Sequence, residues 1–233
     1  MSAPRTTALV AGIFFVLTFL AGIPGALLYA PVLDPAVSIV SAGAEARVRW
    51  GAFLEVLLVI ANVGTAVVLF PLLKRQSESI ALGYVATRIV ESTLIVVGIV
   101  SVLSLVTLGQ DLAGATGADA ASLGAVGPVL ATIHEWASLF GPTYCAGLGN
   151  GLLLGYLLYR SRLVPRGMAL LGLIGGPLTC AAATAVLFGF VARSSGPALI
   201  AALPEIAWEA SLGIYLIVKG FKPAPILTDA GAA

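Results

Sequence analysis

Long apolar runs, separated by Lys, Arg, Gly and Pro, dominate this sequence of 233 residues. A helix of about 20 apolar residues is long enough to cross the roughly 30 Å hydrocarbon core of a bilayer. We find six such runs, at residues 7–29, 50–73, 80–108, 142–159, 167–190 and 198–219. The sequence therefore predicts an all-α fold, a polytopic transmembrane bundle of six spans.

The composition agrees with lipid as the main solvent. Hydrophobic residues make up 59% of the chain and charged residues 10%, whereas a soluble domain carries about 25% charged residues. The 12 basic and 11 acidic side chains are too few to coat a soluble surface. The net charge of +1 provides no basic face for nucleic acid. We expect the lipid bilayer as a partner and no nucleic acid.

Lys and Arg are unevenly divided between the two sides of the predicted bundle. An N-terminus inside the cell would place eight of them in the cytoplasm: Arg5, Lys74, Arg75, Arg160, Arg162, Arg166, Lys219 and Lys222. The outer side would hold Arg47, Arg49 and Arg193. Cytoplasmic loops carry an excess of Lys and Arg, so we expect both termini in the cytoplasm.

One transmembrane domain, residues 1–221, accounts for nearly the whole chain. Residues 222–233 contain two prolines and predict a short flexible cytoplasmic tail. Before the fourth span, Gly141-Pro142 favours a break in the helix, because Pro fits the first turn of a new helix. We therefore expect a short interfacial helix that carries His134 and Glu135, either as candidates at the outer rim of a site or as an ordinary interfacial pair.

Polar side chains inside the predicted spans are the best candidates for function. A charged residue costs about 2.5–3.5 kcal/mol at the centre of an inserted helix. Tyr84, Arg88 and Glu91 follow the spacing i, i+4, i+7, so they share one stripe of the third span. Such a stripe must be solvated by neighbouring helices.

Two other spans carry polar pairs on a shared helical face. Glu55 and Asn62 are seven residues apart, and Glu205 and Glu209 are four apart. If all these stripes face inward, Arg88 meets as many as four carboxylates and can neutralise one or two of them by bidentate hydrogen bonding. The others would be protonated, because desolvation and like charge disfavour the ionised form.

Structural interpretations of the same residues stay open. The charged pair of the third span can be an ion pair within one helix that fixes packing. Glu55 and Glu205 can lie close enough to the outer surface to be hydrated. Asn62 and Asn150 can be interhelical hydrogen-bond donors. Gly151 and Gly155 predict a close helix contact of the small-xxx-small type.

Metal and cofactor chemistry is not indicated. The chain has one histidine, His134, and two cysteines, Cys145 and Cys180, in apolar surroundings. Neither CxxC nor HExxH occurs, and no strand precedes the glycine-rich stretch at residues 147–155. We therefore expect no metal and no cofactor.

Several segments, in this order, resemble an uncharacterised bacterial family of multi-pass integral membrane proteins, a domain of unknown function. They are PRTTALVAG, LEVLLVIANVGTAVVLFPLLKR, ALGYVATRIVES, SVLSLVTL, YRSRLVPR and LIVKGF. The resemblance extends from about Arg5 to Phe221. It implies a location in the bacterial cytoplasmic (inner) membrane and no known activity. It places the family's motif residues at Glu55, Arg88, Glu91, Pro165 and Glu209.

The expected function is the binding or translocation of a small solute or a proton at the Arg/Glu cluster. Arg88 would be an anion partner or charge clamp and Glu91 its counter-ion, with Glu209 and Glu55 as protonatable groups. At 23.6 kDa the chain is small for a transporter acting alone, so a homo-oligomer is a further expectation.

Two other functions remain open. One is a membrane-embedded enzyme that acts on a lipid or prenyl substrate, with Glu209 as general base and His134 and Glu135 at the outer rim. The other is a structural or assembly subunit of a membrane complex, in which the polar residues fix helix register. Whether the protein is an enzyme is thus left undecided by the sequence.

Overall fold

A computed structural model describes residues 3–33, 43–193 and 195–228, and these residues form helices and loops without a strand. The first three helices are α1 (Ala3–Tyr29), α2 (Glu45–Leu73) and α3 (Glu78–Gly114). A short α4 (Gly117–Gly124) leads into one helical stretch made of α5 (Val126–Ser138), the π-helical segments η1 (Leu139–Cys145) and η2 (Gly147–Leu154), and α6 (Gly155–Ser161). The last helices are α7 (Arg166–Leu187), α8 (Gly196–Val218) and α9 (Pro225–Thr228).

Five of the described helices are long and apolar enough to cross a membrane, namely α1, α2, α3, α7 and α8. They correspond to the first, second, third, fifth and sixth predicted spans. Their outward faces are apolar: Leu20, Val67 and Ile200 are 65%, 60% and 67% exposed. Large contiguous apolar surface of this kind marks contact with a membrane or a partner, and it is compatible with a membrane location.

The fourth predicted span does not begin a new helix. In the fully described residues 126–161, α5 continues through Gly141-Pro142 into the π-helical segments, so the expected break is absent there and a separate interfacial helix is not confirmed. Pro142 has no N–H for the Ser138 carbonyl, and the Thr143 hydroxyl donates to that carbonyl instead (3.2 Å). π-Helical hydrogen bonding then carries the chain past the proline.

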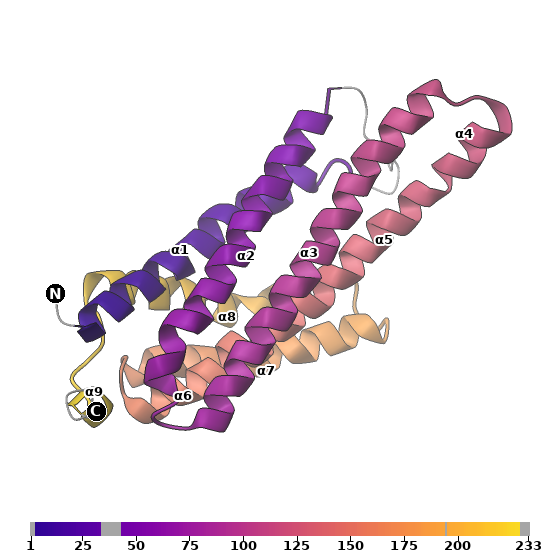
Figure 1. The fold of residues 1–233 in the computed structure, drawn as a ribbon. Coiled ribbons are helices and arrows are strands. Elements are labelled where there is room, and N and C mark those ends of the chain that lie inside the picture. Colours follow the sequence, from indigo (N-terminus) through magenta and orange to yellow (C-terminus); the bar gives the residue numbers. More distant parts are fainter. Residues whose placement is uncertain (1–2, 34–42, 194, 229–233) are drawn as a thin grey trace.

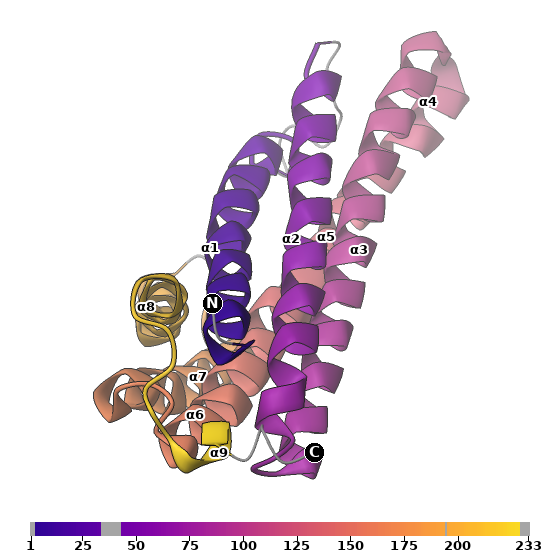
Figure 2. The same ribbon diagram turned by 60° about the vertical axis from the view of Figure 1, so that its left-hand side comes forward.

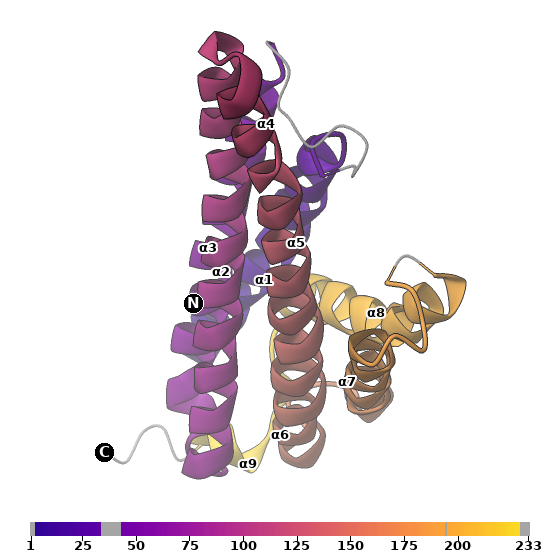
Figure 3. The same ribbon diagram turned by 90° about the vertical axis from the view of Figure 1, so that its right-hand side faces the viewer.

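The long helices α1, α2, α3 and α5 lie side by side, and α4 lies beside the end of α3, where the chain turns back into α5 (Figure 1). Helices α7 and α8 pack against each other and are steeply inclined to the long helices (Figure 3). Figure 2 shows α8 next to α1. The pair of α7 and α8 therefore packs across the side of the long helices.

Two apolar clusters form the core, and polar residues separate them. Along α3, Tyr84 belongs to the first cluster and Ile95 to the second. Arg88 and Glu91 lie between these two positions and are buried, as is Asn62 on the neighbouring α2. The polar layer is therefore enclosed by apolar packing at both ends.

The cations predicted for the cytoplasm gather near one end of the molecule. Arg5 donates hydrogen bonds to the carbonyls of Leu216 (2.9 Å) and Ile217 (2.6 Å), which joins the start of α1 to the end of α8. The N–H of Lys222 donates to the carbonyl of Leu163 (2.8 Å), next to the turn between α6 and α7. The α2–α3 turn lies near the same end (Figure 1).

Residues 222–228, the described part of the tail that the sequence predicts as flexible, are partly helical. Four of them form α9, and Ile226 and Leu227 pack against the first apolar cluster. Packing these two side chains removes apolar surface from water, which favours an ordered position. Residues 229–233 lie outside the described part of the chain.

Candidate functional site

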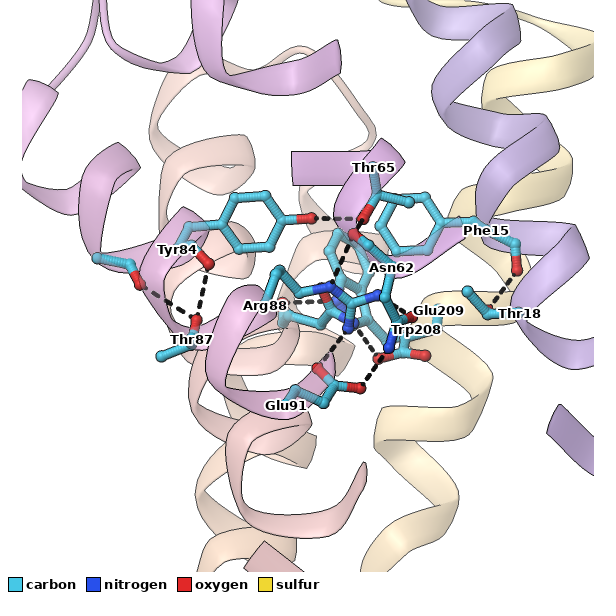
Figure 4. A network of polar contacts seen from close by, with 12 residues as sticks. Phe15, Thr18, Asn62, Thr65, Tyr84, Thr87, Arg88, Glu91, Trp208 and Glu209 are labelled. Atoms are coloured by element: carbon cyan, nitrogen blue, oxygen red, sulfur yellow. Dashed lines mark hydrogen bonds and ion pairs between the residues drawn. The ribbon is translucent and has the colours of Figure 1, made fainter. Parts of the chain in front are cut away.

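Arg88 lies at the centre of a buried network between α2 and α3, with 1% of its surface exposed (Figure 4). Its Nη1 donates to Oε2 of Glu91 (2.7 Å) and its Nη2 to Oδ1 of Asn62 (2.5 Å). Asn62 in turn donates from Nδ2 to Oε1 of Glu91 (3.1 Å). The three side chains form a closed ring, so the buried charges compensate each other and their hydrogen-bonding capacity is largely used.

Tyr84 and Thr65 cover this ring on the side of the first apolar cluster. The Tyr84 hydroxyl donates to Oγ1 of Thr65 (3.3 Å), and Thr65 donates to the backbone carbonyl of Asn62 (2.7 Å) (Figure 4). Both side chains are fully buried. They add polar partners to the ring without giving it access to solvent.

A second group of polar residues, from η2 and α8, lies next to the ring. Asn150 donates from Nδ2 to Oε1 of Glu209 (2.5 Å), and Trp208 donates from Nε1 to the backbone carbonyl of Asn150 (3.0 Å). Glu209 interacts electrostatically with Arg88. Asn150 is thus an interhelical hydrogen-bond donor, as one of the sequence interpretations proposes.

Glu205 has the fewest partners among these carboxyls. It is 4% exposed, and neither of its oxygens has a hydrogen-bond partner among the described residues. It interacts electrostatically with Glu209, Glu91 and Arg88. Three carboxyls and one guanidinium therefore share one buried region. A buried carboxylate without partners is strongly unfavourable.

Glycines allow α7 and α8 to approach η2 closely enough to form this region. A Cβ on Gly175 would lie 2.5 Å from the backbone nitrogen of Glu205, and a Cβ on Gly151 would collide with Cα of Gly176. Gly155, one turn after Gly151, also packs on α7. The predicted small-residue contact is present, because only residues without a side chain permit backbones this close.

Glu55 lies outside the network, so Arg88 does not meet the four carboxylates that the sequence allowed. Glu55 interacts electrostatically with Tyr29, and a Cβ on Gly25 would lie 3.1 Å from its Cγ. Glu55 and Asn62 share a helical face, but seven residues correspond to about 10 Å along the helix axis. Glu55 therefore faces α1 in a different layer.

His134 and Glu135 on α5 also lie apart from the Arg88 ring. The His134 ring packs edge-on against Tyr29, with centroids 5.6 Å apart, and its Nδ1 is 3.3 Å from the carbonyl oxygen of Gly98. Glu135 is exposed, and its backbone carbonyl accepts a hydrogen bond from Nη1 of Arg193. The two residues predicted for an outer rim therefore face different surroundings.

Two members of the site escaped the sequence reasoning as site residues. Thr65 lies three residues after Asn62, and Trp208 lies three residues after Glu205, so helical spacing around the polar residues could have found both. In the part of the chain that the structure describes, no group of three or more His, Cys, Asp or Glu residues could hold a metal ion.

Comparison with known proteins identifies a family but not an activity. No curated protein matches the chain, and no solved structure matches it. Residues 10–220 match the model of a domain of unknown function, DUF4386. This match covers most of the chain and includes every residue of the polar network, and so the protein belongs to the DUF4386 family.

Proposed function

We propose that this protein, in the bacterial cytoplasmic membrane, binds and translocates protons at its Arg/Glu cluster, alone or together with a small solute. The observation that supports this most directly is the buried carboxyl of Glu205, which lacks a hydrogen-bond partner among the described residues. If Glu91, Glu205 and Glu209 were all ionised, Arg88 would leave two negative charges uncompensated. In a medium of low dielectric constant such charges are neutralised by taking up protons.

The carboxyls have different roles in this proposal. Glu91 is the fixed counter-ion of Arg88, because Arg88 and Asn62 both donate hydrogen bonds to it. Glu209 accepts a hydrogen bond from Asn150, which makes its ionised form less unfavourable than that of Glu205. Glu205 has no such donor and favours the protonated form. After Glu209 releases its proton, a proton that moves from Glu205 to Glu209 shifts the negative charge between neighbouring turns of α8.

The proposal includes a sixth membrane crossing, made by the stretch from Val126 to Ser161. At 1.5 Å per residue its 36 residues extend about 54 Å, which exceeds the roughly 30 Å of hydrocarbon. This crossing would carry Asn150 into the interior of the bundle, beside Glu209. Both termini would then lie in the cytoplasm.

Proton translocation is tested in liposomes that contain the purified protein and an enclosed pH-sensitive dye. After an imposed pH step, Glu205→Gln and Glu209→Gln should each reduce the protein-dependent proton flux at least about tenfold, because an amide cannot release a proton at this position. The control Glu78→Gln removes an exposed carboxylate at the start of α3 and should retain wild-type flux.

Infrared difference spectroscopy tests proton binding separately from flux. Wild-type protein should show the carbonyl band of protonated carboxylic acids, and Glu205→Gln should remove the part of it that belongs to Glu205. Thermal unfolding in detergent checks that each variant is folded. The proposal is wrong if wild type and both glutamine variants carry the same flux, or if the wild type shows neither flux nor the infrared band.

A further inference from the structure

A cavity of about 170 Å³ lies between η1, α7 and α8. Its wall includes Leu139, Ala183 and Leu199, which are apolar, and Ala202, which precedes Glu205 by three residues on α8. The cavity therefore ends about one helical turn from the unpartnered carboxyl. An apolar cavity of about 150 Å³ can hold benzene, so this one has room for a molecule with a single ring.

A buried hydroxyl lines this cavity. Thr179 is 4% exposed, and its Oγ1 has no hydrogen-bond partner among the described residues. Threonine in a helix commonly donates to the carbonyl of the preceding turn, as Thr184 does to Cys180 on the same helix (2.8 Å). The Thr179 hydroxyl is thus an unused donor in the cavity wall; its oxygen is buried here, and rotation about the Cα–Cβ bond would bring it to a polar atom inside the cavity.

A guanidinium lines the same cavity. Arg193 follows α7, and its Nη1 donates to the backbone carbonyl of Glu135. A guanidinium has five N–H donors, so further donors remain for a ligand. Desolvation lowers the pKa of Arg193, and an anionic ligand would restore a favourable environment for its charge.

We propose that this cavity binds a small organic acid, with its carboxylate at Arg193 and a hydroxyl or carbonyl oxygen at Thr179. The apolar body of the acid packs against the alanines and leucines of the wall. The inference deepens the proposed function, because it places an acid one turn from Glu205, where its movement can be coupled to a proton. Binding itself does not depend on that coupling.

Three probes separate the two polar contacts. 4-Hydroxybenzoate carries both groups, benzoate lacks the hydroxyl, and phenol lacks the carboxylate. Isothermal titration of the detergent-solubilised protein should give the tightest binding for 4-hydroxybenzoate. Arg193→Gln should weaken the binding of 4-hydroxybenzoate about tenfold, since it removes a charge-assisted hydrogen bond. It should change the binding of phenol little. Thr179→Val should weaken the binding of 4-hydroxybenzoate about threefold or more and leave the binding of benzoate unchanged.

The cavity volume is tested with a matched pair on α7. Ala182 lines the cavity and Ala181 is exposed on the same helix. Ala182→Leu should weaken the binding of all three probes, because the larger side chain fills the cavity. Ala181→Leu should leave their binding unchanged. Arg193→Lys retains the positive charge and should bind 4-hydroxybenzoate better than Arg193→Gln.

The outcomes distinguish this inference from the proposed function. Binding that follows the pattern above while Glu205→Gln leaves proton flux unchanged supports the acid site and contradicts proton translocation. Equal binding of the probes by wild type, Arg193→Gln and Ala182→Leu overturns the acid site. A second result also overturns it: native mass spectrometry shows that the wild type retains an anionic lipid which these variants release, and 4-hydroxybenzoate does not bind.

Discussion

Arg88 shares its hydrogen bonds with two side chains that also bond to each other. Its guanidinium holds Glu91 on α3 and Asn62 on α2, and Asn62 bridges back to Glu91. In such a ring every member compensates its neighbours, so removing one leaves polar groups buried without partners. The ring therefore contributes to the choice of one packing of α2 against α3, whatever else it does.

This interdependence predicts an asymmetric response to mutation. Arg88→Met should lower the free energy of unfolding by about 3–5 kcal/mol, because Glu91 is left as an uncompensated buried charge. The double variant Arg88→Met/Glu91→Leu should recover a large part of this loss, since the charge is then absent. Thermal unfolding in detergent, followed by tryptophan fluorescence, measures both variants.

The control for this prediction is an ion pair of similar local spacing on the surface. Arg49 and Glu45 lie 3.1 Å apart, with side chains 59% and 30% exposed. Arg49→Met should cost about 0.5 kcal/mol or less. Equal losses for the two arginine variants, or no recovery in the double variant, would show that the ring around Arg88 is not a compensated buried unit.

Helical spacing identified the face of each charged residue but not its depth in the bundle. It correctly grouped Tyr84, Arg88 and Glu91 on the buried side of α3. It also grouped Glu55 with Asn62, although Glu55 meets Tyr29 of α1. Spacing reports the angle around a helix axis, whereas contact also requires a matching height on the neighbouring helix. That height depends on tertiary packing.

At the scale of the elements, the contact between α7 and η2 decides how close α8 comes to the site. The backbones of Gly176 and Gly151 touch, and the backbone nitrogen of Leu152 would lie 2.8 Å from a Cβ on Gly176. A methyl group at this point must push the two elements apart. Glu205 on α8 would then move relative to Asn150.

We therefore expect Gly176→Ala to destabilise the protein by about 1–3 kcal/mol through overpacking. The control is Gly167→Ala in the first turn of the same helix, where a Cβ would meet nothing within 4 Å. This second substitution should be neutral or stabilising by up to about 1 kcal/mol, because alanine favours helix more than glycine does. If the two variants have the same unfolding midpoint, the close contact between α7 and η2 is contradicted.

The helical stretch that contains Pro142 shows where element prediction from sequence fails. Gly-Pro is a sound reason to expect a break. The break is avoided because the Thr143 hydroxyl satisfies the carbonyl of Ser138 and the backbone adopts π-helical bonding. Such bonding is rare and has no simple sequence signature. The five other candidate spans were predictable, since length and hydropathy alone define them.

At the scale of the whole molecule, the excess of Lys and Arg near one end predicts an orientation. In a background of Cys145→Ser and Cys180→Ser, Lys74→Cys and Arg160→Cys should react with a membrane-impermeant maleimide only after cells are permeabilised. Asp119→Cys, on the exposed α4 at the other end, should react in intact cells. Labelling of positions 74 and 160 from opposite sides would contradict their placement near one end of the bundle.

The cavity near Arg193 could not be predicted from sequence, because it exists only where three elements meet. Thr179 comes from α7, Leu139 from η1 and Leu199 from α8, and Arg193 lies in the loop between α7 and α8. Nothing in their spacing along the chain links them. The acidic cluster was easier to predict. A charged residue inside an apolar run costs free energy to insert into a membrane, so such residues are easily recognised as candidates.

The length of α3 has a practical consequence for imaging. Its 37 residues extend about 55 Å, and a tilt of 40° still leaves about 42 Å along the membrane normal, more than the roughly 30 Å of hydrocarbon. If α3 crosses a membrane as proposed, part of its length lies outside the hydrocarbon, and we expect the hairpin tip formed by α3, α4 and α5 to emerge from the lipid as a helical knob. An antibody fragment raised against this knob would add mass and a recognisable shape to a 23.6 kDa particle, and it would do so at the end opposite the clustered cations.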